Sequence, residues 1–131
     1  MKLTKILLAG CVAMSFGIAH AAEDAPADHK QWMKDLGSAM GQIRKGVDVE
    51  QNAAKMVAVM PEVKAFWAKR TSDVAVKTCD DSANGAKQAA AAAKAGDQPG
   101  VTAGMKLVGA GCKGCHDVHR EKISDTEYKI K

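Results

Sequence analysis

Apolar side chains recur at alternating spacings of three and four along this chain, and that spacing constrains its fold more than any other feature. Residues three and four positions apart lie on one face of an α-helix, so each run predicts an amphipathic helix packed lengthwise against a neighbour. Four runs predict four helices. They are Met33, Leu36, Met40, Ile43 and Val47; Val49, Ala53, Met56, Met60, Val63 and Trp67; Ala75, Cys79, Ser82, Ala86, Ala89 and Ala93; and Val101, Met105, Val108, Cys112 and Cys115.

Capping and turn residues separate these runs, because their side chains or backbone conformations start and stop helices. Pro61 interrupts the second run and should end or kink that helix near Met60. The stretch 62–70 would then be a short turn or connector that carries Phe66 and Trp67. The predicted boundary residues are Asp28, Gly46, Asp48, Thr71 or Ser72, Gly96 and Asp97.

Short connections between four amphipathic helices predict an all-α fold, an up-down-up-down four-helix bundle. The polar tail 124–131 is expected to be loosely held. The third run contains only small side chains, which has two explanations. Small side chains allow close approach to a neighbouring helix or a flat ring, or they simply reflect the helix propensity of alanine.

The segment Cys112–His116 reads C-x-x-C-H, the attachment signature of a c-type haem. Two thiols three positions apart lie on neighbouring faces of one helical turn, where they can add across the two vinyl groups of one porphyrin. The adjacent imidazole can then become the proximal ligand of the iron. The motif therefore predicts one covalent haem on the last helix, inside one end of the bundle. Five glycines in that helix are costly, and a ring lying against them would explain their presence: Gly100, Gly104, Gly109, Gly111 and Gly114.

Three other interpretations use the same cysteines. A redox pair would belong near a strand–helix unit, and no strand-like stretch precedes the motif. Zinc could take Cys112, Cys115, His116 and His119, although structural zinc ligands usually come as two separated pairs. A disulfide across a two-residue gap inside a helix would be strained.

The first residues resemble a secretory signal peptide. Lys2 and Lys5 precede an apolar run from Ile6 to Ile18, and Ala19–Ala21 is a small-x-small cleavage site. Residues 1–21 are therefore predicted to be removed, leaving 22–131 as one domain in the periplasm, where c-type haem would be attached. An alternative is a lipoprotein signal ending at Cys11, but its hydrophobic segment is short.

Loss of Lys2 and Lys5 lowers the formal net charge from +4 to +2. Such a balance argues against nucleic acid as a partner, and no later segment has the roughly 20 apolar residues that span a bilayer. We therefore expect a soluble protein. With two cysteines assigned to haem, Cys79 is left over, either as a small buried residue or in an intermolecular disulfide.

Two blocks of the chain resemble the class II c-type cytochromes, the cytochrome c′ family and its low-spin relatives. One is Met33–Gly37 with Met40–Gly41 in the first helix, and the more specific one is Cys112–Arg120. The resemblance covers essentially the whole of residues 22–131. It implies a cytochrome c′-like four-helix bundle and often a homodimer through the first two helices.

Carried over residue by residue, the resemblance makes Cys112 and Cys115 the thioether attachments and His116 the proximal ligand. Met33 takes the first-helix position that faces the distal side of the iron, and Arg120 resembles the basic residue that shields the proximal face. As default interpretations from the residues alone, Met33 and Trp67 are core residues, and His29 and His119 are exposed.

The chain departs from the family pattern in three places. His29 stands where an arginine is common, and His119 replaces a more usual aromatic residue. The connector around Phe66 and Trp67 lacks the longer family loop. These departures bear on the polarity of the distal side and on the contacts of the haem propionates.

Two functions correspond to the two states of the distal side. If Met33 ligates the iron, a His/Met pair raises the reduction potential and suits electron transfer to redox partner proteins. If the sixth position stays open, the protein resembles cytochromes c′ that bind NO or CO. The sequence favours the electron carrier, with gas binding as the alternative. No catalytic constellation is visible beyond the haem motif, so a non-enzyme is expected.

Overall fold

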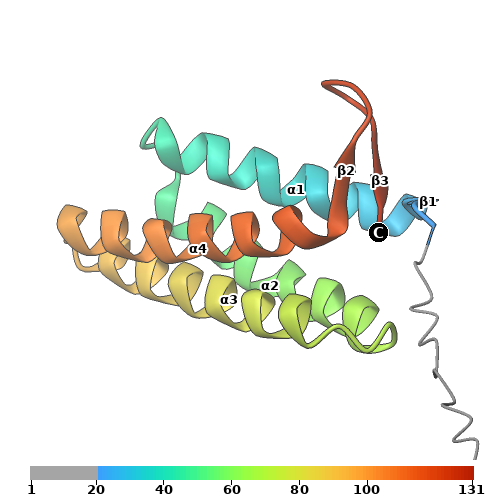
Figure 1. The fold of residues 1–131 in the computed structure, drawn as a ribbon. Coiled ribbons are helices and arrows are strands. Elements are labelled where there is room, and N and C mark those ends of the chain that lie inside the picture. Colours follow the sequence, from blue (N-terminus) through green and yellow to red (C-terminus); the bar gives the residue numbers. More distant parts are fainter. Residues whose placement is uncertain (1–20) are drawn as a thin grey trace, which may run out of the picture.

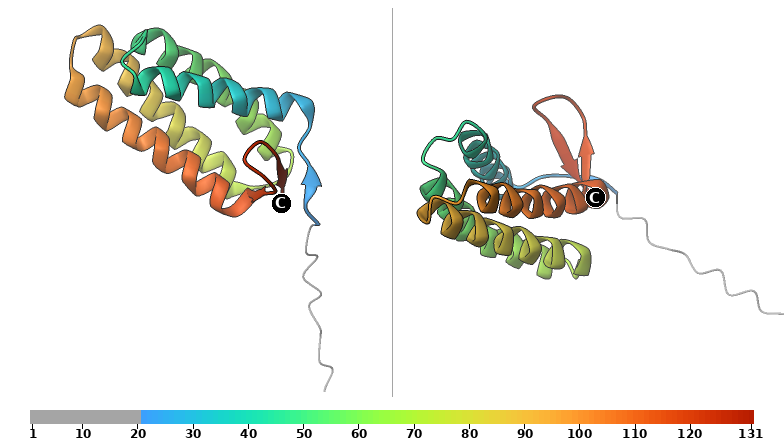
Figure 2. Two further views of the ribbon diagram at one scale, coloured as in Figure 1. Left: turned by 90° about the horizontal axis from the view of Figure 1, so that it is seen from above. Right: turned by 90° about the vertical axis from the view of Figure 1, so that its left-hand side faces the viewer.

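The computed structural model describes residues 21–131, so the predicted signal segment, apart from Ala21, lies outside the described residues. Successive helices run in opposite directions and lie side by side (Figures 1 and 2). Among these residues no helix has both the length and the apolarity needed to cross a membrane. The elements are β1 (Glu23–Asp24), α1 (Ala27–Arg44), α2 (Val49–Ala68), α3 (Asp73–Lys94), α4 (Gln98–His119), β2 (Arg120–Lys122) and β3 (Tyr128–Ile130).

The boundaries of α3 and the start of α4 are those predicted. Ser72 is the N-cap of α3, and its hydroxyl oxygen accepts a hydrogen bond from the backbone N–H of Ala75 at 3.2 Å. Gly96 follows α3 with φ +70°, a conformation that glycine adopts without strain. Asp97 caps α4 by accepting a bond from the N–H of Gly100 at 3.0 Å. These boundaries depend on local chemistry alone.

Two predicted boundaries are wrong. The first helix begins at Ala27 with Pro26 as its N-cap, so Asp28 lies inside the first turn. The second helix continues through Pro61 to Ala68, so the predicted end near Met60 and the connector over 62–70 are wrong. Proline removes one helix hydrogen bond, but the buried face of α2 extends on both sides of it. That face consists of Ala53, Met56, Met60, Val63 and Trp67.

The closest helix pair is α3 with α4, because glycines replace side chains where they cross. A Cβ on Gly104 would lie 2.6 Å from the carbonyl oxygen of Gly85 and 2.7 Å from the nitrogen of Ala89. A Cβ on Gly111 would overlap the hydroxyl of Ser82. Contact with α3 therefore accounts for these two glycines, where the sequence suggested a ring. Close approach also explains the small residues of α3.

The four helices are not packed equally against one another. The main interfaces join α3 to α4, α2 to α3 and α1 to α2, whereas α1 and α4 have no comparable interface. The apolar core nevertheless includes residues from all four helices and from β3. The candidate functional site lies in the space between α1 and α4.

The C-terminal tail forms a hairpin, so the expectation of a loosely held tail is wrong and the fold is not purely helical. Strand β3 lies between β1 and β2, and both pairings are antiparallel. Arg120 pairs with Ile130, and Ile130 is buried, with 3% of its surface exposed. Burial of Ile130 in the apolar core contributes to holding the tail against the helices.

A pair of glycine variants tests the α3–α4 contact. Gly104→Ala should lower the free energy of unfolding by about 1–3 kcal/mol, because its Cβ would meet backbone atoms that cannot move aside. A Cβ on Gly109 in the same helix meets nothing within 4 Å. Gly109→Ala should therefore stabilise the protein by up to about 1 kcal/mol through helix propensity. Urea denaturation followed by circular dichroism measures both, and equal effects would contradict the proposed close contact.

Candidate functional site

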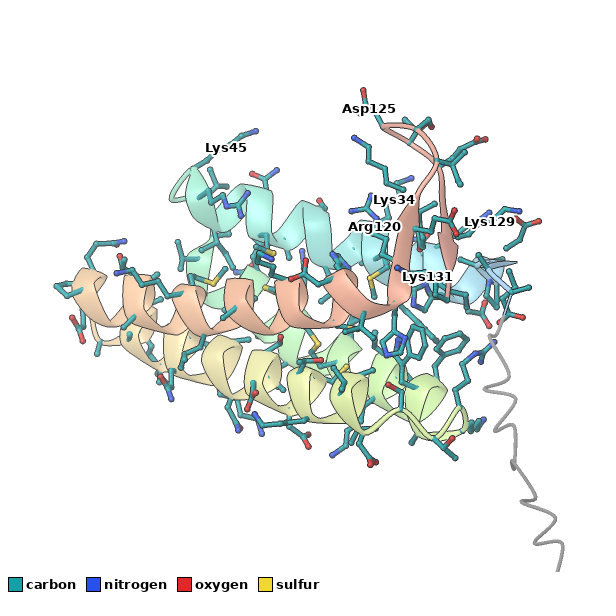
Figure 3. All side chains as sticks on the ribbon, in the orientation of Figure 1. Lys34, Lys45, Arg120, Asp125, Lys129 and Lys131 are labelled. Atoms are coloured by element: carbon teal, nitrogen blue, oxygen red, sulfur yellow. The ribbon has the colours of Figure 1, made fainter. Side chains whose placement is uncertain are left out.

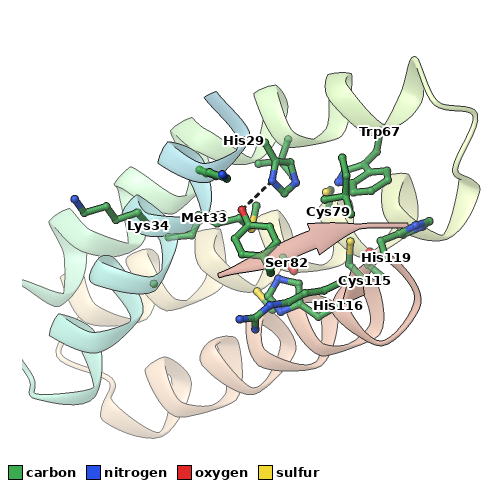
Figure 4. A pocket seen from close by; sticks show the side chains of 18 of the residues that line it. His29, Met33, Lys34, Trp67, Cys79, Ser82, Cys115, His116 and His119 are labelled. Carbon is green, nitrogen blue, oxygen red and sulfur yellow. Dashed lines mark hydrogen bonds between the residues drawn. The ribbon is translucent and has the colours of Figure 1, made fainter. Parts of the chain in front are cut away.

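A cavity of about 1180 Å³ opens between α1 and α4, with α2, α3 and the hairpin completing its wall (Figure 4). This volume exceeds the roughly 300–1,000 Å³ of ordinary small-molecule pockets. All five site residues predicted from the sequence line it, namely Met33, Cys112, Cys115, His116 and Arg120. Residues separated by most of the chain are thus brought to one place.

The α4 wall carries the two thiols of the motif. Cys112 and Cys115 are half-buried, one helical turn apart, and free of any disulfide. Burial raises the pKa of both thiols, while hydrogen bonds with Ser82 and Thr78 of α3 oppose that shift for Cys112 and Cys115 respectively. The thiols are therefore protonated at neutral pH.

His116 follows directly on the same wall and is half-buried. Burial lowers its pKa, and the nearby charge of Arg120 lowers it further, whereas Asp117 acts in the opposite direction. The neutral imidazole is favoured, and this is the form that binds metal ions.

The α1 wall faces these residues across the cavity and is mainly apolar. Met33 is half-buried there, packed against the edge of the core, and Leu36 and Met40 follow on the same face. Gly37 also lines the cavity, and a Cβ placed on it would meet nothing within 4 Å. A thioether sulfur thus lies on the α1 side of the cavity, opposite the α4 wall that carries His116.

Arg120 lies just past the end of α4, in strand β2, and its side chain is exposed. Its guanidinium carbon is 5.4 Å from the ring centre of Tyr128. Figure 3 shows three basic residues on one side of the molecule, Lys34, Arg120 and Lys129. All three line the cavity. The rim is therefore rich in positive charge.

His29 was expected to be exposed at the start of a helix, and this is wrong. Its side chain is buried, with 4% exposed, and its Nδ1 lies 3.1 Å from the hydroxyl of Tyr128. The ring packs against Phe66 and Trp67, with centroid distances of 4.8 and 5.9 Å. The signal that could have placed it is its position four residues before Met33, on the same helical face.

His119, expected at the surface, is half-buried, and both of its ring nitrogens have partners. Its Nδ1–H donates to the carbonyl oxygen of Lys131 at 3.0 Å, so its Nε2 accepts from the hydroxyl of Ser72 at 2.7 Å. The ring stacks on Trp67 at a centroid distance of 4.3 Å. His119 is thus engaged in fastening the C-terminus. Within residues 21–131 no three His, Cys, Asp or Glu side chains are arranged to hold a metal ion, so the zinc interpretation has no support in this geometry.

Two further residues of the cavity wall are buried. Cys79 is buried as predicted, and burial raises the pKa of its thiol to about 12. Trp67 is a core residue as predicted, with 3% of its surface exposed. Its indole Nε1 has no hydrogen-bond partner among the described residues, a feature that no sequence pattern signals.

Comparison with known proteins finds no family model, no curated protein and no solved structure that matches this chain. The resemblance noted from the sequence therefore stays a prediction. Functional inference for this protein rests on the motif and on the geometry of the cavity.

The burial of His29 predicts a pH-dependent stability. Burial, then the charges of Arg70 and His116, lowers its pKa from 6.5 to about 4. Between pH 4 and pH 6.5, therefore, His29 binds a proton in the unfolded chain but not in the folded protein. The free energy of unfolding should have its full value above pH 6.5 and fall by about 3 kcal/mol as the pH approaches 4.

His29→Gln keeps a hydrogen-bonding side chain opposite Tyr128 but cannot titrate. Its unfolding free energy, measured by urea denaturation between pH 7 and pH 4, should decline less steeply than that of the wild-type protein. Identical slopes would show that His29 is not the group responsible.

Proposed function

We propose that this protein is a periplasmic electron-transfer cytochrome that carries one covalent haem c in the cavity between α1 and α4. Cys112 and Cys115 would form the thioether bonds, and His116 and Met33 would be the axial ligands of the iron. One observation carries the proposal. The C-x-x-C-H thiols and imidazole on α4 and the thioether of Met33 on α1 line opposite sides of one large cavity.

The residues present suit an iron porphyrin in three respects. Two protonated thiols and a neutral imidazole occupy neighbouring positions on one helix. The facing wall is mainly apolar around Met33, Leu36 and Met40, as a porphyrin ring requires. The buried indole N–H of Trp67 lacks a partner, which is expected where a polar group of a bound molecule completes the site. Haem iron held by His and Met supplies reversible one-electron transfer.

The protein's own part is to fix the ligands. Cys112 and Cys115 lie on α4, which the glycine contact holds tightly to α3, so the attachment points cannot shift along the helix pair. Met33 lies on α1, which packs against α2 rather than α4. If His116 and Met33 both stayed bound to the oxidised and the reduced iron, electron transfer would require little rearrangement of the protein. The lysines and Arg120 at the rim favour redox partners that present acidic surfaces.

Removal of individual cysteines tests the attachment. The protein is to be purified from a host that matures c-type cytochromes, denatured and weighed. The wild-type mass should equal that of residues 22–131 plus one haem. Cys112→Ala and Cys115→Ala should each lose one thioether bond, and the double variant should carry no covalent haem.

Cys79→Ala is the matched control, because Cys79 lines the same cavity but lies outside the motif. It should retain the covalent haem. A wild-type mass equal to the bare polypeptide would refute the proposal, and a mass that includes residues 1–21 would refute the predicted cleavage.

Substitution of Met33 tests the sixth ligand. The oxidised wild-type protein should show the weak far-red absorption band that accompanies methionine ligation, and Met33→Ala should convert the spectrum to a high-spin form. Met40→Ala is the control, since Met40 lies two turns further along α1 and also lines the cavity. No spectral difference between Met33→Ala and the wild-type protein would exclude Met33 as a ligand.

A second function follows if Met33 stays packed on α1 and does not bind the iron, because the sixth position would then be open. The protein would then bind NO or CO, as a scavenger or sensor. Rapid and complete CO binding to the reduced wild-type protein would favour this function, whereas slow or absent binding would favour the electron carrier.

A further inference from the structure

The indole N–H of Trp67 is a hydrogen-bond donor without an acceptor. Its side chain is 3% exposed, and Nε1 is inaccessible and unpartnered among the described residues. Nearly all buried N–H groups in proteins have a partner, and each exception calls for an explanation. Trp67 lines the large cavity, near Cys79 and His29 in Figure 4. An acceptor on a molecule bound in the cavity is one explanation.

The neighbouring side chains leave Trp67 without an obvious partner in the protein. Both ring nitrogens of His119 are already engaged, with Ser72 and with the carbonyl of Lys131. The Nδ1 of His29 is engaged with the hydroxyl of Tyr128. Trp67 lies between these two rings, at centroid distances of 4.3 Å from His119 and 5.9 Å from His29. No described residue therefore accepts a hydrogen bond from this N–H.

We propose that the Nε1–H of Trp67 donates a hydrogen bond to a propionate carboxylate of the bound haem. The inference rests on the proposed function. A haem attached through its vinyl groups retains two carboxylates as its polar groups, and the rest of the ring is apolar. A carboxylate is also the acceptor that strengthens such a bond most, because it carries charge. Arg120 and Lys30 line the same cavity and supply positive charge to balance it.

Trp67 is thus a positioning residue. It would orient the ring about the thioether attachments by holding a carboxylate at the end of α2, where the cavity wall is otherwise aromatic. The alternative acceptor is a buried water molecule, since polar cavities commonly hold one. If the acceptor is the haem carboxylate, its carbon lies next to the indole nitrogen. If the acceptor is water, it does not.

The Trp32→Phe variant allows the bond to be detected directly. Trp32 is the other tryptophan of the chain and does not line the cavity, so haem attachment should be retained and Trp67 becomes the sole indole. The variant is labelled with ¹⁵N at the indole and, through labelled aminolevulinate, with ¹³C at the propionate carboxylates. Solid-state NMR then measures dipolar coupling between the two labels in the reduced, diamagnetic protein.

A coupling as strong as that of a hydrogen-bonded pair, with nitrogen and oxygen about 2.7–3.2 Å apart, is the expected result. No measurable coupling in a protein that carries covalent haem would overturn the inference and favour water as the acceptor. If the denatured protein proves to carry no covalent haem, the proposed function itself fails. Failure of the Trp67 hydrogen bond is therefore distinguished from failure of haem attachment.

Trp67→Phe provides a second readout, because phenylalanine keeps an aromatic ring and removes the N–H. Its labelled carboxylate resonance should shift from the wild-type position while the covalent haem is retained. Trp32→Phe should leave that resonance unchanged. Equal positions in wild-type protein and Trp67→Phe would also overturn the inference.

Discussion

The close crossing of α3 and α4 determines where the functional residues of this protein point. Gly85, Gly104 and Gly111 remove the side chains that would hold these helices apart, and the interior tolerates no such overlap. Because Gly104 and Gly111 face α3, the rotation of α4 about its own axis is fixed. Cys112 and Cys115 then lie at the edge of that interface, where they contact α3 through Ser82 and Thr78 and still open onto the cavity.

The α1 side of the cavity exists because α1 and α4 do not pack closely against each other. Helix α1 packs on α2 and not on α4, so a domain of this size contains a hollow of about 1180 Å³. Small domains bury a limited share of their surface and rarely leave large voids unfilled. On the proposed function, a haem would complete the core as well as supply the redox chemistry, and His116 and Met33 would hold its iron.

The hairpin and the aromatic residues close one end of this hollow. His29 on α1 reaches Tyr128 of β3, and His119 on α4 reaches the carbonyl of Lys131, so the C-terminal segment is fastened to both helices that border the cavity. The two histidines thus use their hydrogen bonds to stabilise the fold. Trp67 lies between them, and its N–H has no partner among the described residues.

The sequence by itself determined the four helices, the caps at Ser72 and Asp97, and the C-x-x-C-H motif, because periodicity, capping and attachment chemistry all act within a few residues. Tertiary structure decided the rest. The hydrogen bond between His29 and Tyr128 joins positions 99 residues apart, and that between Ser72 and His119 joins positions 47 apart, so no local pattern could reveal these partners. For the same reason the continuation of α2 through Pro61 depended on packing that outweighs a local preference.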